Sequence, residues 1–180
     1  MQPYVPFVGV LILPDKIVPV GTSPVALPDG MVIASIRWHA FTTRARFEVL
    51  DPAERSELAR GQAEGLARRR YALYGPSGDP LLGLKLSWLG TPGRSRVTLP
   101  DGAELKAKGS LVFRRFTVDA PDGSLVARII PTKGWWSVRP DSYALELTRP
   151  VLSPVQAIGL VQFLRAAERS QRQSQRMRTS

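Results

Sequence analysis

Segment 153–167, SPVQAIGLVQFLRAA, constrains the fold most, because it is typical of a helix that has no polar face. Ser153 is a good N-cap and Pro154 suits the first helical turn, so the helix has a marked beginning. The polar side chains of its apolar stretch, Gln156 and Gln162, fall on different sides of a helix. We therefore expect apolar neighbours on all sides of it.

The length of this apolar stretch favours burial within protein over insertion into a membrane. About 10 apolar residues are roughly half of what a bilayer span requires. The preceding chain must then supply the wall that covers the helix.

A repeated pattern in the preceding chain predicts such a wall. An alternating apolar run leads through a turn into a second alternating run, and Asp-Gly turns such as 101–102 and 122–123 are strong hairpin signals. A final alternating strand, 143–147, ends before Pro150. The copies of the hairpin pattern span 47–60, 71–87, 96–108 and 116–129.

Consecutive hairpins form an antiparallel sheet, and closing the sheet removes its exposed edges. We predict a mainly β fold, a closed antiparallel barrel of about twelve strands that encloses the hydrophobic C-terminal helix. The alternative is a sandwich with the helix packed on one face, which would require a polar stripe that the helix lacks. Residues 1–45 are expected to form short strands that either complete the barrel or lie outside it.

These patterns predict one domain and a tail. The expected barrel domain covers 1–168, with N-terminal strands in 1–45, repeated hairpins in 46–149 and the central helix in 153–168. Residues 169–180 are expected to form a basic, flexible tail, since polar termini are usually loose.

Composition limits the chemistry and the partners. The chain has 180 residues and no cysteine, which excludes disulfides, thiolate metal sites and cysteine lipidation. The net charge of +10 implies attraction to polyanions, whether lipid headgroups, nucleic acid or acidic proteins. The N-terminus lacks a basic, uninterrupted signal sequence, so a cytoplasmic location is expected. Abundant Arg and the absence of Asn indicate a GC-rich bacterial source.

With the hairpin copies, the segment 133–143 (KGWWSVRPDSY) and the apolar final helix, the chain resembles the LURP-one-related family, within the tubby C-terminal and phospholipid scramblase superfamily. The resemblance covers residues 46–168 and rests on the order of the strand motifs. It implies an antiparallel barrel of roughly twelve strands threaded by a C-terminal hydrophobic helix. Tubby domains bind phosphoinositides through basic surface residues, and scramblases act at membranes. The cysteine cluster and acidic calcium-binding segment of scramblases are missing here, so the resemblance does not extend to scrambling.

Residues typical of enzymes are scarce. The single histidine, His39, has no cysteine or second histidine with which to build a typical metal site. Asp101, Asp122 and Asp141 occur in turn-like contexts, where backbone hydrogen bonding explains an aspartate. No nucleotide-binding glycine motif occurs. We therefore expect no enzymatic activity, no metal and no cofactor.

Basic residues around the hairpins are the better candidates for a site. Lys106 and Lys108 share one face of their strand, opposite Leu105 and Ala107, and should point to solvent. The expected anion-binding residues are Arg94, Arg96, Lys106, Lys108, Arg114, Arg115, Arg128, Lys133 and Arg139. The expected membrane-contact residues are the tryptophans whose indoles suit an interface, Trp88, Trp135 and Trp136.

The predicted function is non-enzymatic binding of anionic phosphate-bearing surfaces, most simply phospholipid or phosphoinositide headgroups at the cytoplasmic membrane face. Contact with the membrane would be peripheral, without a transmembrane span. One alternative is a structural or protein-interaction module in which charge serves solubility. Another is non-specific nucleic-acid binding, which the charge permits but which lacks an aromatic stacking platform.

Overall fold

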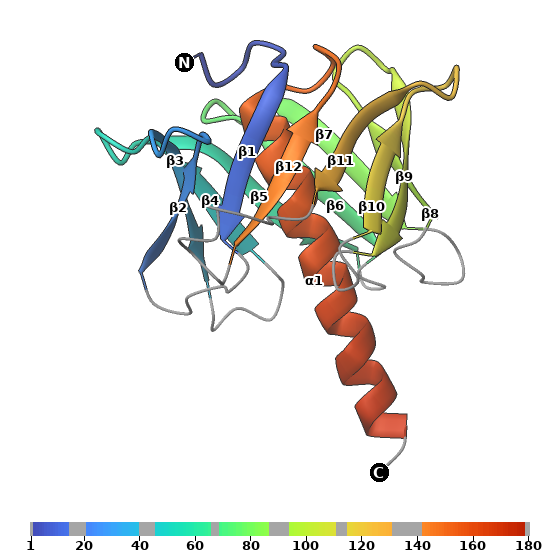
Figure 1. Cartoon of the computed structure of the whole chain (residues 1–180). Helices are drawn as coiled ribbons and strands as arrows, with labels where there is room; N and C mark the ends of the chain where they lie inside the picture. Colours follow the sequence, from blue (N-terminus) through green and yellow to red (C-terminus); the bar gives the residue numbers. More distant parts are fainter. Residues whose placement is uncertain are drawn as a thin grey trace.

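Antiparallel pairing between chain neighbours organises the whole sheet (Figure 1). The computed structural model describes residues 2–14, 21–39, 46–65, 69–86, 94–110, 115–130 and 142–178. The strands are β1 (Gly9–Pro14), β2 (Thr22–Ala26), β3 (Val32–Trp38), β4 (Arg46–Leu50), β5 (Glu57–Glu64), β6 (Arg70–Tyr74), β7 (Pro80–Leu86), β8 (Arg94–Thr98), β9 (Glu104–Ser110), β10 (Arg115–Asp119), β11 (Leu125–Ile130) and β12 (Ser142–Leu147). One helix follows, α1 (Pro154–Arg178).

The first and last strands close the sheet into a barrel. β1 pairs with β12 over six residues, from Gly9 opposite Leu147 to Pro14 opposite Ser142. All twelve strands are members of this single closed wall. The predicted fold class is therefore confirmed, and residues 1–45 complete the barrel, since β1, β2 and β3 lie in them.

The helix occupies the interior. Residues 157–164 of α1, Gln162 included, are buried on all sides, and Phe163 is 1% exposed. Small residues allow this close packing: a Cβ on Gly159 would lie 2.7 Å from Leu73 Cδ2, and one on Gly61 would lie 2.9 Å from Phe163 Cε1. No helix in the described part of the chain has an apolar stretch long enough to cross a bilayer.

Side chains of its first turn fix the start of α1. The backbone N–H of Gln156 donates to Ser153 Oγ, and the N–H of Ser153 donates to Gln156 Oε1, which is a capping box. Gln156 Nε2 also donates to the carbonyl of Leu81 at 2.9 Å. These bonds satisfy the polar groups of a helix end that is buried in the barrel mouth.

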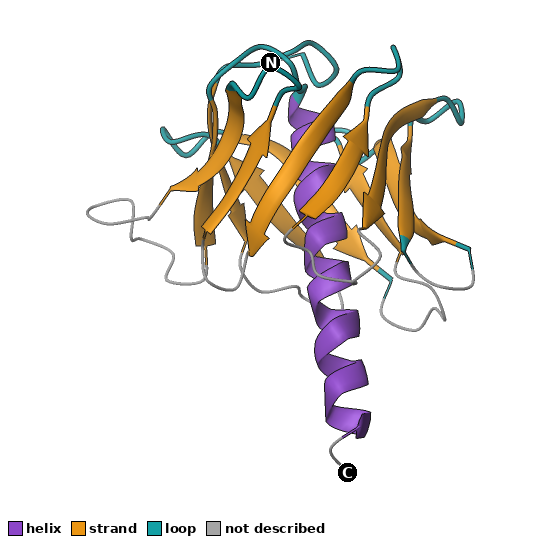
Figure 2. Ribbon diagram, turned by 90° about the vertical axis from the view of Figure 1, so that its right-hand side faces the viewer, coloured by secondary structure: helices purple, strands orange, loops and turns teal. Residues whose placement is uncertain are grey.

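The end of α1 differs from the expectation. The sequence predicts a helix that ends near 168, whereas α1 continues to Arg178 and leaves the barrel at the end opposite to its start (Figures 1 and 2). No Gly or Pro follows Glu168, so nothing in residues 169–178 stops the helix. At 1.5 Å per residue, these ten residues extend the helix by about 15 Å. The flexibility of the predicted tail stays a prediction.

Five hairpin turns lie at the end where α1 begins, which we call the turn end (Figure 2). In the turn 99–103, Gly102 donates to the carbonyl of Leu99, and Asp101 accepts from the N–H of Ala103. Gly102 adopts φ 83°, a conformation that favours glycine. Asp122 accepts in the same way from Ser124, so both aspartates have the predicted turn role. Asp141 lies outside the described residues.

Candidate anion-binding surface

Strand alternation places the lysines of β9 outside the barrel. Lys106 and Lys108 are exposed, while Leu105 and Ala107 are 2% and 0% exposed. This orientation agrees with the prediction from their spacing. The outside of the wall is therefore where their charges act.

Strand register then aligns four cations across four neighbouring strands. Arg70 on β6 lies opposite Lys85 on β7, Lys85 lies opposite Arg96 on β8, and Arg96 lies opposite Lys106 on β9. We call these four residues the basic strip. Like charges directly opposite each other on adjacent strands destabilise a sheet. The strip therefore carries a repulsion that a bound anion would relieve.

Carboxylates neutralise only part of this surface. Arg96 forms an ion pair with Glu104 at 3.1 Å, and the neighbouring Lys108 forms one with Asp119 at 2.8 Å. Among the described residues, no carboxylate lies within ion-pair distance of the other strip members. The members without such a partner are Arg70, Lys85 and Lys106. They are exposed, so their charges face solvent.

The other predicted residues are distributed differently. Arg94 lies opposite Lys108, next to the strip, and Arg115 lies opposite Ser110 at the start of β10. Arg128 on β11 is exposed but forms an ion pair with Glu146 at 2.5 Å. Outside the described residues lie Arg114, Lys133, Arg139, Trp88, Trp135 and Trp136.

Two strip members, Arg70 and Lys85, are absent from the sequence-based set. Lys85 stands between Leu84 and Leu86 in an alternating run, so the rule that places Lys106 outside also applies to it. Alternation predicts on which face of a strand a residue lies, but not which residues of the adjacent strands lie beside it. The missing information is the register between strands.

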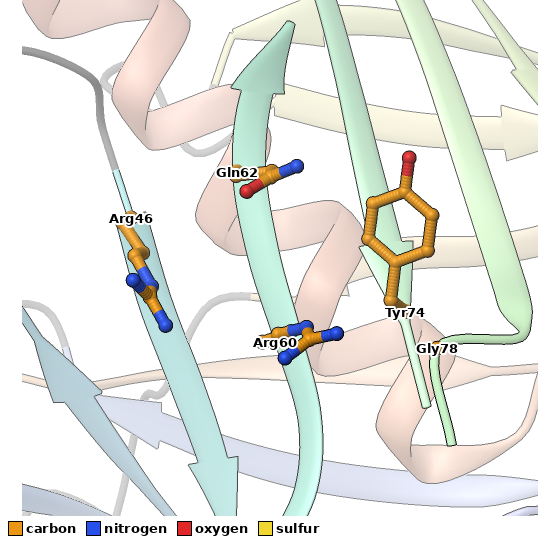
Figure 3. Close-up of a pocket in the computed structure, with 5 residues that line it drawn as sticks. All are labelled: Arg46, Arg60, Gln62, Tyr74 and Gly78. Atoms are coloured by element: carbon orange, nitrogen blue, oxygen red, sulfur yellow. The ribbon is translucent and has the colours of Figure 1, made fainter. Parts of the chain in front are cut away.

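A pocket of about 310 Å³ opens on the outside of β4, β5 and β6 (Figure 3). Register sets Arg46 opposite Gln62 and Arg60 opposite Tyr74. The guanidinium of Arg60 extends toward the β6–β7 turn, where a Cβ on Gly78 would lie 3.9 Å from its Nη2. These five residues line the pocket.

The charge of the pocket is positive. Glu48 lies opposite Arg60, but its carboxylate accepts from His39 at 2.9 Å and lies 3.6 Å from Arg37. Within the described ranges, Arg46 and Arg60 have no ion pair. Two guanidinium groups with free donors can bind an oxyanion.

Tyr74 is held at one side of this pocket by the hydrogen bond that it donates to Glu64. This bond raises the pKa of Tyr74 above its ordinary value of 10.0, and burial and the charge of Glu64 raise it further, while Arg60 opposes the shift. Tyr74 therefore stays protonated and neutral at physiological pH. It adds no negative charge that would repel an anion.

The fold and its outer surface define the class of protein: a closed antiparallel barrel around a helix, with a basic outer wall. A similar structure is an X-ray structure of a protein from Arabidopsis thaliana, AT5G01750, with a TM-score of 0.63 and 15% sequence identity. The match covers 92% of this chain and 94% of that one, so the two share the fold over almost their whole length. No protein-family model and no curated protein matches the chain.

Proposed function

We propose that this protein is a non-enzymatic module that binds an anionic, phosphate-bearing surface, namely phospholipid or phosphoinositide headgroups at the cytoplasmic face of a membrane. The observation that carries the proposal is the basic strip, in which four cations line up across adjacent strands and three of them have no ion pair within the described part of the chain. Assignment to the LURP-one-related family is part of the proposal. The barrel fold and the order of its strand motifs support it.

The two basic features suit different parts of such a surface. The strip is an open row of single charges, so it fits several headgroups at once. The pocket offers two arginines, whose planar donor groups bind phosphate oxygens in pairs. We infer that the strip supplies general affinity and that the pocket favours a monoester phosphate, as on an inositol headgroup.

Flotation with vesicles of graded anionic lipid content tests the proposal. We expect binding that rises with the anionic fraction and falls between low and moderate salt, because salt screens exposed charges. Binding that ignores lipid charge would refute a headgroup ligand. Equally strong binding to a random oligonucleotide would point to a general attraction for polyanions.

A charge-conserving variant separates the pocket from the strip. R46K/R60K keeps both charges but removes the forked donors, so we expect roughly a tenfold loss of preference for phosphoinositide over phosphatidylserine vesicles of equal charge. Binding to phosphatidylserine vesicles should change by less than about twofold. The matched control is R37K/R128K, which makes the same change outside the pocket and should keep the preference. If R46K/R60K keeps it as well, the pocket does not select the headgroup.

A further inference from the structure

Charge is separated along the barrel axis. Five described hairpin turns and the β12–α1 connection lie at the turn end. The acidic residues of these connections are Asp29, Asp51, Glu54, Asp79, Asp101 and Asp122. Their basic residues are Arg55 and Arg149, and Arg149 pairs with Asp122. The turn end therefore repels anions.

At the opposite end, from which α1 emerges, the described strand ends are mostly basic. Every second strand from β4 to β10 begins there with an arginine. These arginines are Arg46, Arg70, Arg94 and Arg115. Lys85 and Lys108 lie near the ends of β7 and β9 at the same level. Among the described residues of these strand ends, Glu64 accepts the hydrogen bond of Tyr74, and Glu48 contacts Arg37 and His39. We call this set of strand ends the basic rim.

The projecting part of α1 extends the positive charge beyond the rim. We call residues 169–178 the projecting segment; in Figure 1 its end lies below the side of the barrel that contains β8, β9 and β10. It carries Arg169, Arg172, Arg176 and Arg178 and no carboxylate. Arginines in the last turns of a helix also interact favourably with its dipole.

We propose that the barrel meets an anionic bilayer in one orientation, with the basic rim and the projecting segment toward the lipid and the turn end away from it. This inference rests on the proposed function and adds the contact surface to it. The projecting segment extends the helix by about 15 Å. If a flat bilayer touches both the basic rim and this segment, the barrel axis must be tilted relative to the bilayer normal. Strands of five to eight residues, tilted as in a barrel, span about 12–22 Å along its axis. This distance exceeds a Debye length at physiological salt, so screening weakens the repulsion from the acidic turns.

Single-cysteine labelling tests this orientation directly, since the chain contains no cysteine. S174C carries a fluorophore on the projecting segment, and M31C carries one on the β2–β3 turn, at an exposed position outside the pocket. With phosphatidylserine vesicles that hold a headgroup-attached quencher, we expect strong quenching of the label at 174 and little at 31. Equal quenching, or stronger quenching at 31, would overturn the proposed orientation. Absence of any vesicle binding by the wild type is a different result and would refute the proposed function.

Charge variants at the two ends give a second, independent measurement. At physiological salt, R169Q/R172Q/R176Q should lower vesicle partitioning about a hundredfold. D29N/D101N/D122N changes charge by the same amount in the opposite sense, and asparagine keeps the Oδ1 acceptor of each turn. We expect this variant to raise vesicle partitioning by less than twofold. If the aspartate variant gains as much affinity as the arginine variant loses, net charge alone sets the affinity. If the arginine variant still binds as the wild type does, the projecting segment is not part of the contact surface.

Discussion

Replacement of Arg70, Lys85 and Lys106 by glutamine should weaken binding to anionic vesicles about a hundredfold at low salt. Each cation near an anionic membrane contributes about 1 kcal/mol, so three contribute about 3 kcal/mol, and 1.4 kcal/mol corresponds to a factor of ten. The loss should shrink as salt increases, because these side chains are exposed. The measurement is the partition coefficient on sedimented phosphatidylserine vesicles over a range of salt concentrations.

The control variant R37Q/R128Q/R149Q removes the same charge from arginines whose partners are Glu48, Glu146 and Asp122. We expect less than a fivefold loss, because their charges are already balanced locally. Removing like charges that face each other should leave the thermal midpoint of the strip variant unchanged or slightly higher. A control that loses as much affinity as the strip variant would show that position is irrelevant.

The interior of this fold could be predicted from the sequence, because burial leaves a strong pattern. The apolar part of α1, with Gln156 and Gln162 on different sides, has no polar face that could lie against solvent. Both glutamines have local uses. Gln156 closes the capping box, and Gln162 Oε1 accepts from the indole N–H of Trp38 at 3.3 Å. Gln156 has partners at both amide atoms, whereas Gln162 has one at its oxygen and, among the described residues, none at its Nε2. Two such separated polar side chains are still compatible with a buried helix.

The outer surface could be predicted only strand by strand. Alternation correctly placed Lys106 outside, but it carries no information on which residue of β8 lies beside it. That register depends on the turns and on irregularities such as the shift between Leu73 and Tyr74. The basic strip depends on the register of four strands, so the pattern of any single strand does not identify Arg70 and Lys85 as its members.

The pocket could not be predicted from the sequence for a different reason. Segment 55–70 has high helix propensity but contains Gly61 and Gly65, so its sequence does not decide between helix and strand and favours a strand that ends near Gly61. β5 instead continues to Glu64. Gly61 is required in it because a Cβ there would lie 2.2 Å from Phe47 Cζ. Packing against the aromatic core thus decides the conformation that points Arg60 and Gln62 outward.

Replacement of Phe163 by alanine should lower the free energy of unfolding by about 3–5 kcal/mol. The ring lies at the centre of the barrel, 5.2 Å from the ring of Phe47 and 5.3 Å from that of Tyr71. Its removal leaves a cavity that the closed wall cannot collapse to fill. In a chain of this size the loss should lower the thermal midpoint by roughly 10 °C. Chemical denaturation followed by tryptophan fluorescence measures it.

Two further variants separate loss of packing from loss of fold. F163L keeps most of the volume and should cost about 1–2 kcal/mol, so it reports on the site even if F163A does not fold. M31A removes a similar side chain from an exposed turn position and should change stability by less than about 0.5 kcal/mol. If F163A costs no more than M31A, the helix is not enclosed. The outer wall would then no longer be the only surface that can meet a partner, and the binding surface would have to be assigned anew.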